Sequence, residues 1–196
     1  MGLLAGLGAV AFDRLCRWVV EVALVAGVGY DQGVPGGEAS DVAGAVGPFA
    51  PLLLLATLAA GGLLSGVLVH LLAPEAGGHG TDAVIRAYHR GHGLVRARVP
   101  LVKMVASAIT LGTGGSGGRE GPIAQIGAGI GSVLATRLGR ANRERRILLL
   151  AGVGAGIGAV FRAPVAGAVF AAEVLYVEAE FEPEALVPSF LSTVVA

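Results

Sequence analysis

The sequence predicts an all-α membrane protein built from tilted and broken transmembrane helices. Apolar residues make up 54% of the 196 positions and charged residues only 14%, with a mean hydropathy of +0.75. A soluble domain is charged at about 25% of its positions. The run 49–73 carries His70 as its sole titratable side chain and exceeds the roughly 18 apolar residues typical of a membrane span. The alternative for this run is a buried core helix of a soluble protein.

The expected elements follow in chain order. Residues 1–30 form an apolar segment whose charges at 13, 14, 17 and 21 are spaced to pair along one helical face. Glycine, proline, aspartate and serine predict a loop over 31–48, before the 49–73 span. Residues 74–98 contain a short helix and a basic connector, and helices follow over 99–113 and 119–138. A second basic connector at 137–146 leads into a helix that runs to Phe161. After the break at Pro164 come an apolar stretch to Glu173, a linker and a last apolar segment to 196.

Loop charges predict an orientation in the membrane. The 31–48 loop holds three acids and no lysine or arginine, whereas the connectors 86–98 and 137–146 hold four and five arginines. Basic loops stay on the cytoplasmic side. We therefore expect the acidic loop outside and both arginine connectors inside.

Glycine occupies 33 positions, many of them spaced for close helix packing. "GAGIG" (127–131) and "GVGAGIG" (152–158) place small residues at alternate positions. Because there is little hydrophobic drive between helices in lipid, small residues that let backbones approach favour their association. These two runs are therefore predicted to be packing surfaces.

The stretch "GTGGSGGREGPIAQIG" (112–127) predicts an anion site at the start of a broken helix. A helix that restarts within the membrane has free N–H groups and a positive dipole end, which together attract anions. Pro122 suits the first turn, and glycines such as Gly118 and Gly121 let an ion approach the backbone. When ionised, the Glu120 carboxylate competes for this site; when protonated, it releases it. Glu120 is therefore the predicted gate.

Two alternatives apply to this stretch. Glu120 and Arg119 are adjacent, so they also fit a simple buried ion pair or an N-terminal cap. Gly112, Gly114 and Gly117 match the G-x-G-x-x-G dinucleotide fingerprint, which requires a preceding strand and an acid about 20 residues later. Position 137 is an arginine, so this match is weak.

Other function classes find little support in the sequence. The zero formal net charge implies no general affinity for nucleic acid. The single cysteine, Cys16, excludes an internal disulfide and a cysteine-rich metal site. We expect no enzyme, metal or cofactor, because no nucleophile–base pair or metal-ligand cluster is recognisable.

Three motifs resemble the CLC family of chloride channels and proton/chloride antiporters. They are "GREGP" (118–122) with "IAQIGAGIG", "GVGAGIGAVFRAPVAGAVFAAE" (152–173), and "PEAGGHGTD" (74–82) as a diverged first anion-binding stretch. The resemblance implies an all-helical homodimer of a multi-pass cell-membrane protein, in which each subunit contains two inverted repeats. It implies that chain 1–196 is the N-terminal half of such a membrane domain without the second repeat. It also implies gating by Glu120 and anion contacts from Gly78, His79, Gly80, Gly118, Arg119 and Gly121.

Two departures from the family pattern bear on transport. His79 replaces the usual serine, and its N–H offers a donor that attracts anions more strongly when the ring is charged; helix capping is the alternative role. Val174 stands where antiporters carry an inner proton-handling glutamate, which predicts weak proton coupling. The expected function is transport of chloride or similar small anions across the lipid bilayer, as a channel or a weakly coupled transporter. The alternative is a membrane-embedded fragment or assembly partner without transport.

Overall fold

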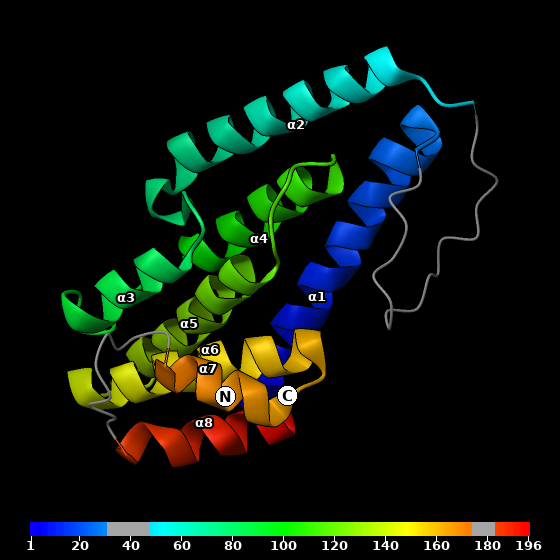
Figure 1. Ribbon diagram of the computed structural model, residues 1–196. Coiled ribbons are helices and arrows are strands. Elements are labelled where there is room, and N and C mark those ends of the chain that lie inside the picture. Colours follow the sequence, from blue (N-terminus) through cyan, green and yellow to red (C-terminus); the bar gives the residue numbers. More distant parts are fainter. Residues whose placement is uncertain (31–47, 174–182) are drawn as a thin grey trace.

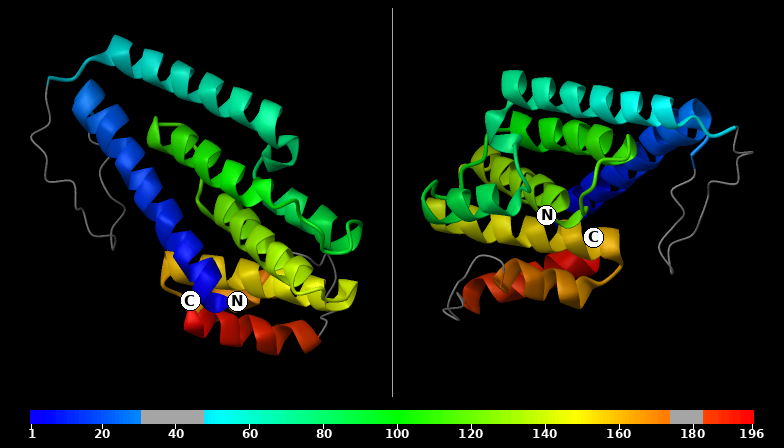
Figure 2. Two further views of the ribbon diagram at one scale, coloured as in Figure 1. Left: turned by 180° about the vertical axis from the view of Figure 1, so that it is seen from behind. Right: turned by 45° about the horizontal axis from the view of Figure 1, so that its top comes forward.

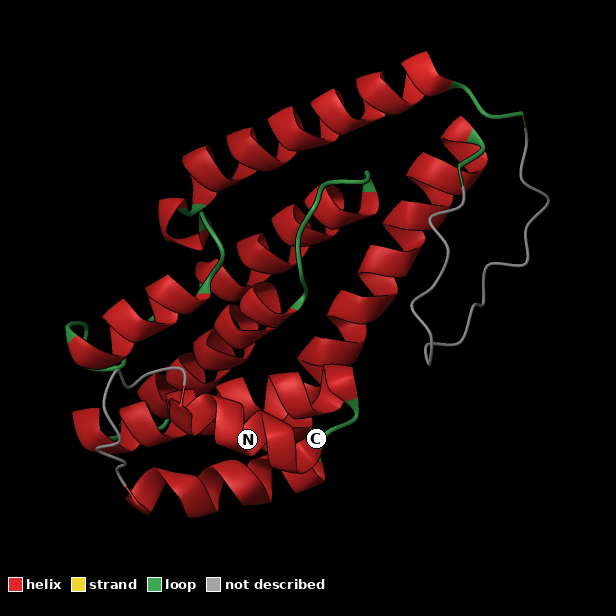
Figure 3. Ribbon diagram, in the orientation of Figure 1, coloured by secondary structure: helices red, strands yellow, loops and turns green. Residues whose placement is uncertain are grey.

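The computed structural model describes residues 1–30, 48–173 and 183–196. Within these ranges the chain is helical and contains no strand (Figure 3). The helices are α1 (Gly2–Val20), the π-helical η1 (Glu21–Ala26), α2 (Pro51–Leu72), the 3-10 turn η2 (Pro74–Ala76), α3 (Thr81–His89), α4 (Arg98–Gly112), α5 (Glu120–Arg137), α6 (Asn142–Phe161), α7 (Pro164–Glu173) and α8 (Pro183–Val195). The all-helical prediction is confirmed. Almost all of the acidic loop, and Val174, lie outside the described residues.

Helices α5 and α6 pack backbone to backbone at the centre of the molecule. A Cβ added at Gly127 would overlap the carbonyl oxygen of Gly152, and one at Gly152 would overlap that of Gly127. One turn along, a Cβ at Gly131 would overlap the carbonyl oxygen of Leu148. The two glycine runs are therefore packing surfaces, as predicted.

Helix α1 packs against α4, α5 and α6, and lies at an angle to them (Figure 1). Its residues Phe12 and Cys16 are buried in one core cluster with Ile123 of α5 and Val153 of α6. On the same helix Arg17 Nε donates to Asp13 Oδ2 at 2.9 Å, which confirms the predicted spacing of charges along one face.

Helix α2 forms an outer layer on the other side of α4, as both views in Figure 2 show. Only Gly61 and Ser65 of this helix are buried. Ser65 Oγ donates to the carbonyl oxygen of Ala106 at 3.1 Å and accepts from Thr110 Oγ1 at 2.7 Å. Most of its leucines are exposed, which contradicts the reading of 49–73 as a buried soluble core helix. Among the described residues α2 is also the one helix long and apolar enough to cross a bilayer.

The basic connector 137–146 is partly helical. Helix α6 begins at Asn142, so three of the five connector arginines lie in its first turns. Glu144 at the third position accepts from the Ala141 backbone N–H at 3.2 Å, and this contact fixes the start of the helix.

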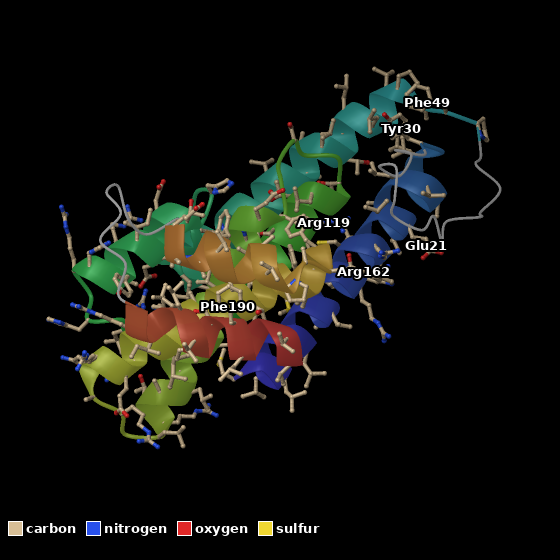
Figure 4. All side chains as sticks on the ribbon, turned by 60° about the horizontal axis from the view of Figure 1, so that its bottom comes forward. Glu21, Tyr30, Phe49, Arg119, Arg162 and Phe190 are labelled. Atoms are coloured by element: carbon tan, nitrogen blue, oxygen red, sulfur yellow. The ribbon has the colours of Figure 1, made fainter. Side chains whose placement is uncertain are left out.

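The chain turns sharply after α6, before Pro164 begins α7. Arg162 ends α6 with a left-handed backbone, at φ 52° and ψ 34°. Figure 4 labels the Arg162 side chain. The same figure labels Tyr30, which follows η1, and Phe49, which precedes α2; the centroids of these two rings lie 5.7 Å apart. Helix α8 returns beside α1, so that the two chain ends lie close together (Figure 1).

Candidate anion site

A cleft of 510 Å³ lies between α2, α4, the 74–79 turn and the glycine loop that precedes α5. Four of the predicted site residues line it: Gly78, His79, Gly118 and Pro122. The rest of its polar lining comes from hydroxyl and basic side chains on α2, α4 and the glycine loop: Ser65, His70, Lys103, Ser107, Thr110 and Ser116. Hydroxyls, backbone amides and cations are all groups that interact favourably with an anion.

Two helix N-termini meet beside the cleft, because the 77–80 turn packs against the start of α5. A Cβ added at Gly121 would overlap the His79 carbonyl, and one at Gly80 would lie 2.6 Å from the Gly121 carbonyl oxygen. Gly80, with φ 116°, is the residue before α3, and Gly121 is the second residue of α5. The positive ends of two helix dipoles therefore converge here. Gly80 and Gly121 serve this close contact and do not line the cleft.

Lys103 is a functional candidate that the sequence reasoning did not single out. It lies on α4, its side chain is 3% exposed, and it lines the cleft. Its Nζ donates to the carbonyl oxygens of Ala76 at 3.0 Å and Gly78 at 2.7 Å. The lysine therefore holds the turn in place and brings a positive charge to the cleft. The sequence feature that could have identified Lys103 is that it is the sole charged residue within 99–113.

Glu120 begins α5 between Gly118 and Pro122, which line the cleft, but Glu120 itself is not among the lining residues. Its carboxylate lies over the α-carbon of Gly118, so closely that a Cβ there would overlap Glu120 Oε2. The Glu120 side chain is exposed, whereas Pro122, two residues later, is buried and lines the cleft. The absence of a side chain at position 118 therefore leaves room for the Glu120 carboxylate.

Arg119 points away from the cleft, toward α1. Its Nη1 donates to Asp13 Oδ1 at 2.9 Å, while Asp13 Oδ2 accepts from Arg17. Asp13 thus ties the residue before α5 to the first helix. This long-range ion pair could not be read from the sequence, where Arg119 and Asp13 are 106 positions apart.

His79 is exposed at the rim of the cleft. Its Nδ1 lies 3.1 Å from Thr81 Oγ1 in the first turn of α3, and its ring covers Gly121.

The dinucleotide-binding interpretation of Gly112, Gly114 and Gly117 is wrong, because helix α4, and not a strand, precedes the loop. A Cβ at Gly112 would crowd Val19, and Gly114 has φ 97°, so packing and backbone geometry account for these two glycines.

Comparisons with known proteins agree with this architecture. The family model described as "Voltage gated chloride channel" matches residues 61–196. The H(+)/Cl(-) exchange transporter ClcA of Citrobacter koseri is 37% identical over 174 residues, and that of Salmonella arizonae is 36% identical over 174. Each match covers 88% of this chain and 34% of the relative, so the chain spans about a third of the length of these curated relatives.

One solved structure gives the same answer for the fold. The crystal structure of a slow cyanobacterial Cl⁻/H⁺ antiporter superimposes with a TM-score of 0.66 and 25% sequence identity, over 99% of this chain and 42% of that one. The helices of this chain thus follow the arrangement of part of that antiporter. The family model, the relatives and this likeness together establish that the chain belongs to the CLC family of voltage-gated chloride channels.

Proposed function

We propose that this chain takes part in chloride transport across a membrane, and that the cleft beside α5 is the part of the pathway where the anion binds. The observation that carries the proposal is the meeting of three positive features at one cleft: the N-termini of α3 and α5 and the buried Lys103. These features favour the binding of a small anion without any metal or cofactor.

Glu120 acts as the gate in this proposal. Its carboxylate lies next to the glycines that open the cleft, where it competes with the anion when ionised and withdraws when protonated. The pairing of Arg119 with Asp13 supports this role, because it gives Arg119 a carboxylate partner other than its neighbour Glu120. Proton coupling is weak in this scheme, since Val174 replaces the inner acid of the family's antiporters.

The membrane placement follows from α2 and the arginines. The exposed leucines of α2 face lipid, the basic connectors face the cytoplasm, and the acidic loop 31–48 faces outward. The chain is then a multi-pass segment of a homodimeric cell-membrane protein. A cysteine placed at Ser40 is expected to react with an impermeant thiol reagent from outside, and one at Asn142 is not.

The transport proposal is tested in a chimera. Residues of this chain replace the matching segment of the Citrobacter koseri exchange transporter, and chloride efflux from liposomes is recorded at pH 7 and pH 5. Acid is expected to activate the flux, and Glu120→Gln and Glu120→Ala are expected to abolish this activation while leaving the protein folded. Well-folded Glu120→Gln chimera with unchanged acid activation would contradict the gating role.

Calorimetric titration of chloride into the 196-residue chain itself gives a second readout that does not depend on the chimera. His79→Ala is expected to weaken binding, because it removes the imidazole N–H donor at the rim of the cleft. A chain that inserts into membranes, binds no chloride and supports no flux in the chimera would instead be a non-transporting assembly fragment.

A further inference from the structure

Gln125 is a buried polar residue on α5 that lies behind the candidate anion site. It is 3% exposed and is not among the residues that line the cleft. Its amide Nε2 donates to the backbone carbonyl oxygen of Glu75 at 2.7 Å. Because a carbonyl oxygen only accepts hydrogen bonds, this contact fixes which end of the Gln125 amide is nitrogen.

The other end of the same amide lies against Gly80. A Cβ added to Gly80 would be 3.2 Å from Gln125 Oε1. The single amide therefore contacts both Glu75 and Gly80, the two ends of the segment 75–80. Among the described residues Oε1 is buried and accepts no hydrogen bond. A buried acceptor without a donor costs free energy, so stability alone does not account for a glutamine at this position.

The segment 75–80 has its carbonyl oxygens occupied and two of its N–H groups available. Gln125 donates to its first carbonyl, and Lys103 Nζ donates to two more, at 3.0 and 2.7 Å. Within the described part of the chain, no backbone carbonyl accepts from the N–H groups of Gly78 and His79, and both residues line the cleft. Backbone N–H groups in such a turn favour an anion.

We propose that Gln125 is a positioning residue of the anion site: by contacting both ends of the segment 75–80, it holds the N–H groups of Gly78 and His79 at the cleft. This inference rests on the proposed function, because it takes the cleft to bind chloride. Lys103 brings a charge into the cleft and acts on the anion directly. Gln125 is uncharged and lies outside the cleft, so its effect on the anion passes through the segment.

Gln125→Met removes both ends of the amide while keeping the length of the side chain. The chloride affinity of the 196-residue chain, measured by calorimetric titration, is expected to fall roughly threefold to tenfold, as for the loss of one hydrogen bond that orders the site. The melting temperature is expected to change little, because the buried acceptor is lost together with the donor. Gln125→Asn is a second variant: its shorter amide cannot reach both Glu75 and Gly80, so the same loss of affinity is expected.

Ser132→Ala is the matched control on the same helix. Ser132 is buried, and its Oγ accepts from the Val95 N–H at 2.8 Å and donates to the Gly93 carbonyl oxygen at 2.6 Å, so it ties a different connector to α5. This variant is expected to lower the melting temperature more than Gln125→Met and to leave chloride affinity unchanged. Wild-type affinity in both Gln125 variants, or an equal loss in Ser132→Ala, would overturn the positioning role.

Hydrogen exchange followed by mass spectrometry gives a readout that needs no chloride. Gln125→Met is expected to speed exchange in peptides that cover 75–80, and Ser132→Ala is expected to leave those peptides unchanged. A wild-type chain that binds no chloride contradicts the transport proposal, and the exchange rates then decide whether Gln125 holds the segment. A wild-type chain that binds chloride, with exchange in 75–80 unchanged by Gln125→Met, overturns the positioning role alone.

Discussion

Helices α2 and α5 are both long and apolar, yet they occupy opposite environments. Twelve of the 18 residues of α5 are buried, whereas two of the 22 residues of α2 are. The difference lies in the kind of apolar residue: α5 carries glycine and alanine along its length, and α2 carries leucine. Small residues mark the surface that meets another helix, and large aliphatic residues mark the surface that meets lipid.

The sharpest way to break this comparison is to add one methyl group to a glycine in each helix. Gly127→Ala forces a Cβ into the carbonyl of Gly152 and is expected to destabilise the fold by about 3 kcal/mol. Gly62→Ala in α2 meets nothing within 4 Å and is expected to stabilise by up to about 1 kcal/mol through helix propensity. Thermal unfolding in detergent, followed by circular dichroism, measures both. Shifts of the same sign would contradict the assignment of the two surfaces.

Lys103 tests how strongly the turn 74–79, which follows α2, is held against α4. Lys103→Met removes two charge-assisted hydrogen bonds and leaves the carbonyls of Ala76 and Gly78 without that donor, a loss of about 2 kcal/mol. The turn is also expected to become sensitive to protease. Ser107→Ala, which lines the same cleft, is the control and is expected to leave both readouts unchanged.

Arg162 tests whether a turn outside both helices limits stability. Its left-handed backbone disfavours a side chain with a Cβ, so Arg162→Gly is expected to stabilise by about 1 kcal/mol. Arg162→Ala keeps the Cβ and is expected to gain little. An equal gain from both substitutions would locate the effect in the lost charge and not in the backbone.

The smallest expected effect concerns Glu75 and Arg96 on the connector. The hydrogen bond from Arg96 holds the pKa of the Glu75 carboxyl below its usual range. A depressed pKa contributes stability above the unfolded-state pKa, and this stability is lost as pH falls through the lowered value in the folded state. The side chains are about half exposed, so the contribution is below about 1 kcal/mol. Glu75→Gln is expected to flatten this part of the stability profile between pH 6 and pH 3.

The sequence predicted the positions of the helices far better than the side-chain contacts between them. The glycine runs, the break before Pro164 and the helix start near Glu120 follow local rules of packing and backbone geometry, and the structure agrees with each. The Asp13–Arg119 pair and the Lys103 contacts join segments 106 and 25 or more positions apart, so no local pattern encodes them. The contact between Gly121 and His79 is likewise not encoded locally: the sequence predicts that Gly121 lets an ion approach the backbone, whereas in the structure the His79 ring covers Gly121.

The contact between Gly127 and Gly152 has a mechanical consequence. With no side chain between the two backbones, α5 and α6 cannot slide or roll past each other without their main chains separating, so they form a stiff frame. Helix α2, by contrast, buries only Gly61 and Ser65 against its neighbours. Any movement that widens the cleft is therefore expected to come from α2 and the turn that follows it, while α5 and α6 keep their positions relative to each other.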